Sequence, residues 1–242
     1  MDPCLFALIS TYVPEHFTIL TELAGGFLIK EIRDGNTYAN GVLHSFNDEP
    51  AEIQPNGTKG WWRNGERHRD RDLPALIWSD GTKEWWWNGK RHRDNDLPAE
   101  IFDDNKHRIW YRNGQKHRDN DLPAVIHFDN SQEWYQNGEH WRANDLPVIV
   151  WSTGTKEWRQ NGRLHRDNDL PAIIWPDGYR AWYRNGYSHR DNDLPAVIYS
   201  DGSQEWWQTG ERHRDNVNLP AVIFSDGTQS YWWHGQCTYN VS

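Results

Sequence analysis

A His-Arg-Asp triplet recurs along this chain, and histidine and aspartate are among the side chains that general acid–base catalysis and metal binding use most. The triplets begin at His68, His92, His117, His165, His189 and His213. Chemistry that is performed once needs an asymmetric set of groups, whereas each triplet here stands in nearly the same local sequence. The recurrence therefore indicates that the triplets hold the molecule together. We expect no catalytic residue and no enzyme activity.

Kinase chemistry and zinc binding are two specific activities that the triplet suggests. Protein kinases carry His-Arg-Asp in their catalytic loop, but their glycine-rich phosphate loop, their Val-Ala-Ile-Lys lysine and their Asp-Phe-Gly motif are missing from this sequence. If each repeat adds two strands, neighbouring histidines lie about 10 Å apart, whereas zinc needs its ligand nitrogens at about 2 Å. We therefore expect neither a metal nor a cofactor, and we assign the histidines to packing and hydrogen bonding.

Each histidine is followed by a short acidic stretch, such as Asp94-Asn95-Asp96, that resembles the start of a calcium-binding loop. The glycine and the distal glutamate of an EF-hand are missing. Asp and Asn also favour the turn conformations that a connection between strands needs, and their carboxylates can pair with the nearby arginines. This structural role is the favoured interpretation, and calcium binding is the alternative left open.

These motifs belong to a unit of about 24 residues that recurs from about Asp34 to the C-terminus. Two of its best copies are residues 80–102 and 201–224. One such unit cannot bury its own apolar face, so a fixed period of this length predicts a stacked array. At the fifth position of the histidine series, Trp141 replaces the histidine.

The units carry two kinds of tight-turn dipeptide, Asp-Gly (with Asn56-Gly57 as a variant) and Asn-Gly, and both favour the positive φ angles of type I′ hairpin turns. Alternating turns of this kind predict an antiparallel meander. Two-residue turns fix which residues face each other. We therefore expect Trp86 to face Arg91, Glu84 to face Arg93, and Leu76 to face Trp85.

Tryptophan recurs at one position of the unit, and these residues are expected to form the core of the array: Trp61, Trp85, Trp110, Trp134, Trp158, Trp182 and Trp206. The regular pattern breaks in the middle of the array at Trp141, Ala143 and Arg159. We take these three residues as a candidate patch for a partner. Exposed tryptophans could also stack on sugars, so a carbohydrate- or ligand-binding module is an alternative function.

Residues 1–28 differ from the repeats. Asp2 and Pro3 can start a helix that carries Leu5, Phe6, Leu8, Ile9 and Tyr12, and a second short helix is expected from Pro14 to Leu23. We expect this segment to be a helical cap on the first hairpin and residues 29–242 to form the repeats.

The composition is rich in aromatic residues, with 17 Trp, 10 Tyr and 7 Phe, and the formal net charge is -9. Proteins that bind nucleic acid usually show a basic footprint, so nucleic acid is not an expected partner. No apolar run approaches the ~18 residues that span a membrane, and residues 4–13 lack the basic flank of a signal peptide. Cys4 and Cys237 are the only cysteines, which fits an intracellular location.

The motif Trp-x-Asn-Gly-x-x-His, as in Trp86, Asn88, Gly89 and His92, resembles the MORN repeat family. The chain departs from the family where Thr82-Lys83-Glu84 replaces Tyr-x-Gly, and residues 93–99 replace Gly-x-Gly. Its His-Arg-Asp-x-Asp-Leu-Pro-Ala arrays resemble those of large DNA viruses of amoebae. The resemblance implies a scaffold for protein–protein interaction, such as a viral structural or host-interaction component, located in the host cytoplasm or the virion.

Residues 5–20 distantly resemble the start of an F-box, which recruits a ubiquitin-ligase core. That resemblance implies a substrate adaptor as an alternative function. From all of these features we predict an all-β, elongated antiparallel β-hairpin repeat array, MORN-like, with a single-layer or half-pipe sheet and a short N-terminal helical cap. We expect a non-enzymatic scaffold that binds protein partners and has no integral membrane association. Self-assembly through the edges of the sheet is a further expectation.

Overall fold

The computed structural model describes residues 16–23, 26–216 and 218–241. It divides into two units, residues 1–115 and 116–242. In the described ranges every regular element is a β-strand, and none is a helix long and apolar enough to cross a membrane. The prediction of an all-β chain of antiparallel hairpins is therefore confirmed.

The described part of the first unit contains fifteen strands, and one more strand crosses its C-terminal boundary. They are β1 (His16–Leu23), β2 (Gly26–Arg33), β3 (Asn36–Ala39), β4 (Val42–Leu43), β5 (Glu52–Ile53), β6 (Lys59–Gly60), β7 (Trp62–Arg63), β8 (Glu66–Arg67), β9 (Leu76–Ile77), β10 (Lys83–Glu84), β11 (Trp86–Trp87), β12 (Lys90–Arg91), β13 (Glu100–Ile101), β14 (Arg108–Ile109), β15 (Tyr111–Arg112) and, at the boundary, β16 (Gln115–Lys116).

The second unit repeats the same pattern of very short strands and closes on two longer ones. They are β17 (Val125–Ile126), β18 (Gln132–Glu133), β19 (Tyr135–Gln136), β20 (Glu139–His140), β21 (Ile149–Val150), β22 (Lys156–Glu157), β23 (Arg159–Gln160), β24 (Arg163–Leu164), β25 (Ile173–Ile174), β26 (Arg180–Ala181), β27 (Tyr183–Arg184), β28 (Tyr187–Ser188), β29 (Val197–Ile198), β30 (Gln204–Glu205), β31 (Trp207–Gln208), β32 (Glu211–Arg212), β33 (Val222–Ile223), β34 (Gln229–Trp233) and β35 (Gln236–Val241).

The expected helical cap is wrong where the structure describes it. Residues 16–23 form β1, which pairs with β2 in register from His16–Arg33 to Leu23–Gly26. The segment carries the β-branched residues Thr18, Ile19 and Thr21, and such residues favour a strand when a neighbouring strand is available. The expected first helix, and the part of the F-box resemblance up to residue 15, lie outside the described residues.

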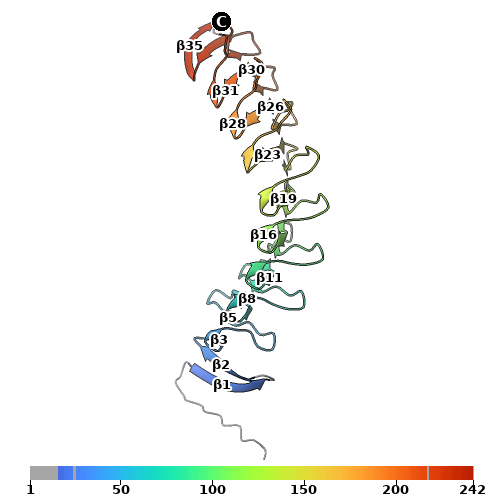
Figure 1. Cartoon of the computed structure of the whole chain (residues 1–242), viewed down its shortest axis with the longest axis vertical. Coiled ribbons are helices and arrows are strands. Elements are labelled where there is room, and N and C mark those ends of the chain that lie inside the picture. Colours follow the sequence, from blue (N-terminus) through green and yellow to red (C-terminus); the bar gives the residue numbers. More distant parts are fainter. Residues whose placement is uncertain (1–15, 24–25, 217, 242) are drawn as a thin grey trace, which may run out of the picture. The chain divides into compact units, whose positions relative to one another are not determined.

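Between β5 and β33, each repeat contributes two strands to a sheet and one separate two-stranded hairpin. In the second unit β25 pairs with β26, while β27 and β28 form their own hairpin. Figure 1 shows such hairpins following one another in chain order within this unit. The third part of a repeat is the connection that leads from the hairpin back to the sheet, and its sequence is Asp-Asn-Asp in four copies.

The two turns of a repeat differ. Asn185-Gly186 is the expected two-residue turn, with φ angles of 52° and 91° between the paired residues Arg184 and Tyr187. At Asp177-Gly178 only the glycine has positive φ, and the backbone N–H of Trp175 donates to the carbonyl oxygen of Tyr179. This turn therefore has three residues between its closing pair, a length at which an αL glycine produces a bulge.

The extra turn residue changes which side chains share a face. Leu76 faces Glu84 and not Trp85, so the predicted pairing and face assignment are wrong there. Around the Asn-Gly turn, Trp86 faces Arg91 as predicted, and the guanidinium lies 5.1 Å from the ring centroid. The predicted pair of Glu84 with Arg93 does not form, because Glu84 pairs with Arg91 and Arg93 pairs with Asp72 of the preceding connection.

A groove at the repeat break

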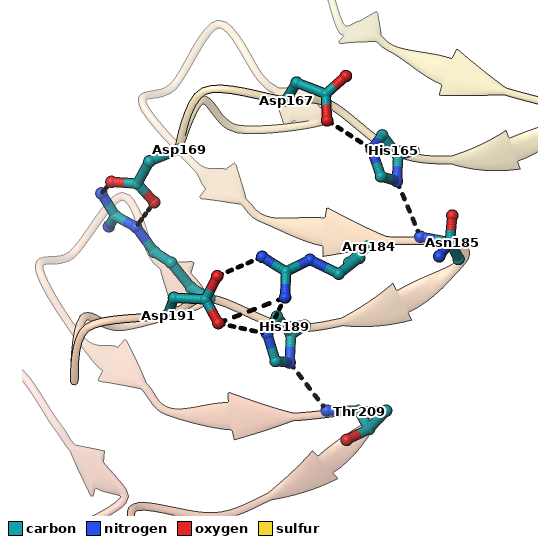
Figure 2. Close-up of polar contacts among 9 residues, drawn as sticks. His165, Asp167, Asp169, Arg184, Asn185, His189, Asp191 and Thr209 are labelled. Carbon is teal, nitrogen blue, oxygen red and sulfur yellow. Dashed lines mark hydrogen bonds and ion pairs between the residues drawn. The ribbon is translucent and has the colours of Figure 1, made fainter.

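In the regular repeats the histidine joins its own connection to the next hairpin. Nε2 of His165 lies 3.1 Å from Oδ1 of Asp167, and Nδ1 accepts a hydrogen bond of 3.0 Å from the backbone N–H of Asn185 (Figure 2). Because Nδ1 accepts, Nε2 carries the proton in the neutral ring. The same two contacts recur one repeat later at His189. Both ring nitrogens are therefore used for structure.

The last aspartate of each connection holds the tryptophan and arginine of the next repeat. The Asp169 carboxylate accepts from Nε and Nη2 of Arg190 at 2.8 and 2.9 Å, which holds the pKa of Asp169 below its ordinary value. The backbone oxygen of Asp169 accepts from the indole N–H of Trp182 at 3.0 Å. The Arg190 guanidinium lies 3.8 Å from the centroid of the Trp182 ring. One aspartate thus positions a stacked cation and ring in the neighbouring repeat.

The tryptophans expected in the core are all buried under such an arginine or in the equivalent place. Each has a relative exposure of 5–7%: Trp61, Trp85, Trp110, Trp134, Trp158, Trp182 and Trp206. An alanine column is buried beside them. The backbone N–H of Trp182 donates to the carbonyl oxygen of Ala196, whereas at Trp134 the acceptor belongs to Val148. Within the described residues, His, Cys, Asp and Glu form no group of three that could hold a metal ion.

The break in the pattern removes the histidine–aspartate pair. The backbone keeps its course, since the N–H of Trp141 still donates to the carbonyl oxygen of Trp134 at 3.2 Å. The Trp141 side chain is 52% exposed, and Ala143 occupies the place of the aspartate. An indole ring has no acceptor nitrogen. The backbone N–H of Asn161 therefore faces a position that cannot supply the acceptor found in the neighbouring repeats.

At seven other turns of the array that acceptor is a histidine Nδ1, at distances of 3.0–3.3 Å: His44, His68, His92, His117, His165, His189 and His213. A groove of about 440 Å³ lies at the break. Its walls include Trp141, Arg142 and Asp145, together with residues 158–161 and 165–168 of the next repeat. We call it the break groove. The equivalent groove one repeat later, at residues 165–192, measures about 110 Å³.

Arg159, the third residue of the expected patch, lines the break groove but has a structural explanation. It occupies the aromatic position that Trp86 holds in its own repeat, and it faces Leu164, which stands at the position of Arg91. Its Nη2 lies 2.7 Å from Oε2 of Glu157, the carboxylate that the arginine of the opposite strand reaches in other repeats, as Arg91 reaches Glu84. In this repeat the cation that contacts the glutamate is therefore on the first strand of the hairpin, at Arg159, and the residue that faces it, Leu164, is apolar.

A series of shielded carboxylates was not predicted from the sequence. Burial raises the pKa of Glu133, but hydrogen bonds from His140, Tyr135 and His127 outweigh it and lower the pKa to about 2. Glu84 likewise accepts from Arg91, Trp78 and Trp86, and its pKa is lowered although burial opposes this. The alternation of Glu84 with Trp86 along the strand is the sequence signal that could have revealed these clusters.

Two of the carboxylates, Glu157 and Glu205, anchor members of a row of aromatic side chains in the second unit. Trp151 donates to Glu157 at 2.7 Å and Tyr199 donates to Glu205 at 3.2 Å. Between them, Trp175 contacts the ring of Tyr179, which in turn contacts Tyr199. We call this row the aromatic face. It consists of Trp151, Trp175, Tyr199 and Phe224, with exposed fractions of 37–46%.

Comparison with known proteins finds no family model, no curated protein and no solved structure that matches this chain.

Proposed function

We propose that this chain is a non-enzymatic repeat scaffold that binds a protein partner through the aromatic face. The observation that supports it is the row of half-exposed rings, one from each repeat, between Trp151 and Phe224. Contiguous exposed apolar surface is uncommon on monomeric proteins and usually marks an interaction site. Tryptophan and tyrosine are also the residues that most often dominate the binding energy of interfaces.

Hydrogen bonds hold two of these rings in place, which favours a binding role. Glu157 and Glu205 fix the polar atoms of Trp151 and Tyr199, so less side-chain entropy is lost when a partner binds. The repeated histidines and aspartates are occupied in contacts between repeats. They serve the scaffold, which supports a function without catalysis.

The test compares two double variants of the full chain in affinity capture from cells that express it. Trp175→Gln with Phe224→Gln alters the aromatic face, and Tyr187→Gln with Trp233→Gln alters exposed rings at the Asn-Gly turns and their equivalents. We expect a partner that the wild type and the turn variant retain and the face variant loses. Equal recovery by both variants, or recovery of none by the wild type, would contradict the proposal. Sedimentation velocity on the same proteins detects the case in which the partner is a second copy of the chain.

A further inference from the structure

The break groove differs from its neighbours in composition as well as in volume. In the smaller groove one repeat later, Arg184 is a lining residue and contacts both His189 and Asp191 (Figure 2). At the break the residue equivalent to Arg184 is Gln160, which is shorter and uncharged, and Ala143 has no polar side chain. Two groups that remain available at the groove are the exposed indole ring of Trp141 and the backbone N–H of Asn161.

A second wide groove, of about 370 Å³, lies in the first unit at residues 44–71. There Ser45 and Phe46 stand in place of the arginine and aspartate of the triplet, but His44 remains and accepts from the backbone N–H of Asn64 at 3.2 Å. That groove keeps its regular hydrogen bond. The break groove differs from it in two ways. Trp141 is exposed there, and the backbone N–H of Asn161 faces this tryptophan in place of a histidine acceptor.

The charges around the break groove indicate a neutral ligand. Each arginine that lines it is already paired with a carboxylate: Arg142 with Asp121 at 2.8 Å, Arg159 with Glu157 at 2.7 Å, and Arg166 with Asp145 at 2.8 Å. An anionic ligand would have to compete with these pairs. Asp167 pairs with His165 at 3.1 Å, yet its side chain is 73% exposed, so its carboxylate can still accept from a hydroxyl group.

We propose that the break groove binds one pyranose ring of a neutral oligosaccharide. The apolar face of the sugar stacks on the Trp141 indole. One hydroxyl oxygen accepts from the Asn161 N–H, and another hydroxyl donates to the Asp167 carboxylate. A small number of convergent polar groups beside an aromatic wall is the usual arrangement of a small-molecule site. The volume of about 440 Å³ accommodates a single ring and its substituents.

The structure offers a variant that closes the groove by restoring the regular repeat. Trp141→His with Ala143→Asp rebuilds the histidine–aspartate pair, gives Asn161 its acceptor, and is expected to leave the fold at least as stable as the wild type. The converse variant, His189→Trp with Asp191→Ala, creates the same arrangement beside Gln208 and Thr209, which correspond to Gln160 and Asn161.

The experiment is calorimetric titration of the full chain with neutral oligosaccharides of glucose, mannose, galactose and N-acetylglucosamine, and with sialylated and sulfated ones. We expect one neutral class to bind the wild type at one site, with affinity at least about tenfold weaker in the closed variant, a loss of about 1.4 kcal/mol or more. The converse variant should bind two equivalents. Absence of binding by every neutral probe, preference for the acidic probes, or unchanged affinity in the closed variant overturns the proposal. The aromatic-face variant should bind the sugar normally, so the two proposals fail separately.

Discussion

The carboxylate of Asp169 and the guanidinium of Arg190 belong to consecutive repeats and form a two-point pair, with Nε and Nη2 of the arginine 2.8 and 2.9 Å from the two carboxylate oxygens. The arginine side chain is shielded between this carboxylate and the Trp182 ring. The pair therefore couples each repeat to the one before it, and it recurs as Asp72 with Arg93 and Asp193 with Arg214.

Replacement of Arg190 by alanine should destabilise the protein. The variant loses charge-assisted hydrogen bonds and a cation–π contact, and we expect the free energy of unfolding to fall by about 2 kcal/mol. Arg184→Ala is the matched control, because Arg184 also pairs with an aspartate but both side chains are about half exposed. An exposed pair of this kind contributes less than about 1 kcal/mol. Urea unfolding of both variants measures the difference, and equal losses would contradict the assigned role of the Asp169–Arg190 pair.

Trp182 and Trp175 test the distinction between core and surface tryptophans. Trp182 is 6% exposed and Trp175 is 46% exposed. Deletion of a large buried aromatic side chain costs roughly 3–5 kcal/mol, so Trp182→Ala should lower the unfolding midpoint strongly. Trp175→Ala should cost less than about 1.5 kcal/mol, since nearly half of its surface already contacts solvent. Thermal or urea unfolding followed by circular dichroism compares the two, and a Trp182→Ala protein as stable as the wild type would remove the tryptophan column from the core.

Stability should fall in acid through Glu133. Its pKa is about 2 in the folded chain against an ordinary 4.5, so the folded state favours the charged carboxylate. This contribution is fully present above pH 4.5 and is lost as the pH falls towards 2. With allowance for solvent screening, it amounts to about 2 kcal/mol. We expect Glu133→Gln to be less stable than the wild type at pH 7 and nearly equal to it at pH 2. Urea unfolding across this range measures the difference, and a gap independent of pH would refute the assignment.

The exchange of Arg159 and Leu164 predicts a double-mutant coupling. Arg159→Tyr alone removes the cation from Glu157 and should destabilise the protein by about 2 kcal/mol, because a shielded carboxylate loses its charged partner. With Leu164→Arg added, the repeat gains an aromatic–arginine pair like those of Trp86 with Arg91 and Trp207 with Arg212, and at least half of the loss should be recovered. Chemical unfolding of the two single variants and the double variant gives the coupling energy. Simple additivity would show that the two positions act independently.

The strand order and the Asn-Gly turns were predictable because they depend on local sequence. Asn185-Gly186 supplies two residues that tolerate positive φ, and a two-residue turn leaves one possible register for Arg184 and Tyr187. The 24-residue period likewise identified the tryptophan positions that are buried. The Asp-Gly turns were not predictable in the same way, since Asp177 adopts negative φ and the loop holds one residue more. One extra residue moves every following side chain to the other face of the strand.

The amino-acid sequence by itself determined the repeat, its hairpins and the place where the pattern fails, because spacing and turn chemistry are local properties. Tertiary structure alone decided what the failure means. Asp169 and Arg190 are 21 residues apart, and Asn161 meets the position of Trp141 only when two repeats stack. Because of the way the repeats stack, the replacements at Trp141 and Ala143 leave an open groove. Arg159, in contrast, faces Leu164 and supplies the cation beside Glu157. The physical reason is that hydrogen bonds between repeats depend on geometry across the stack, which no single repeat contains.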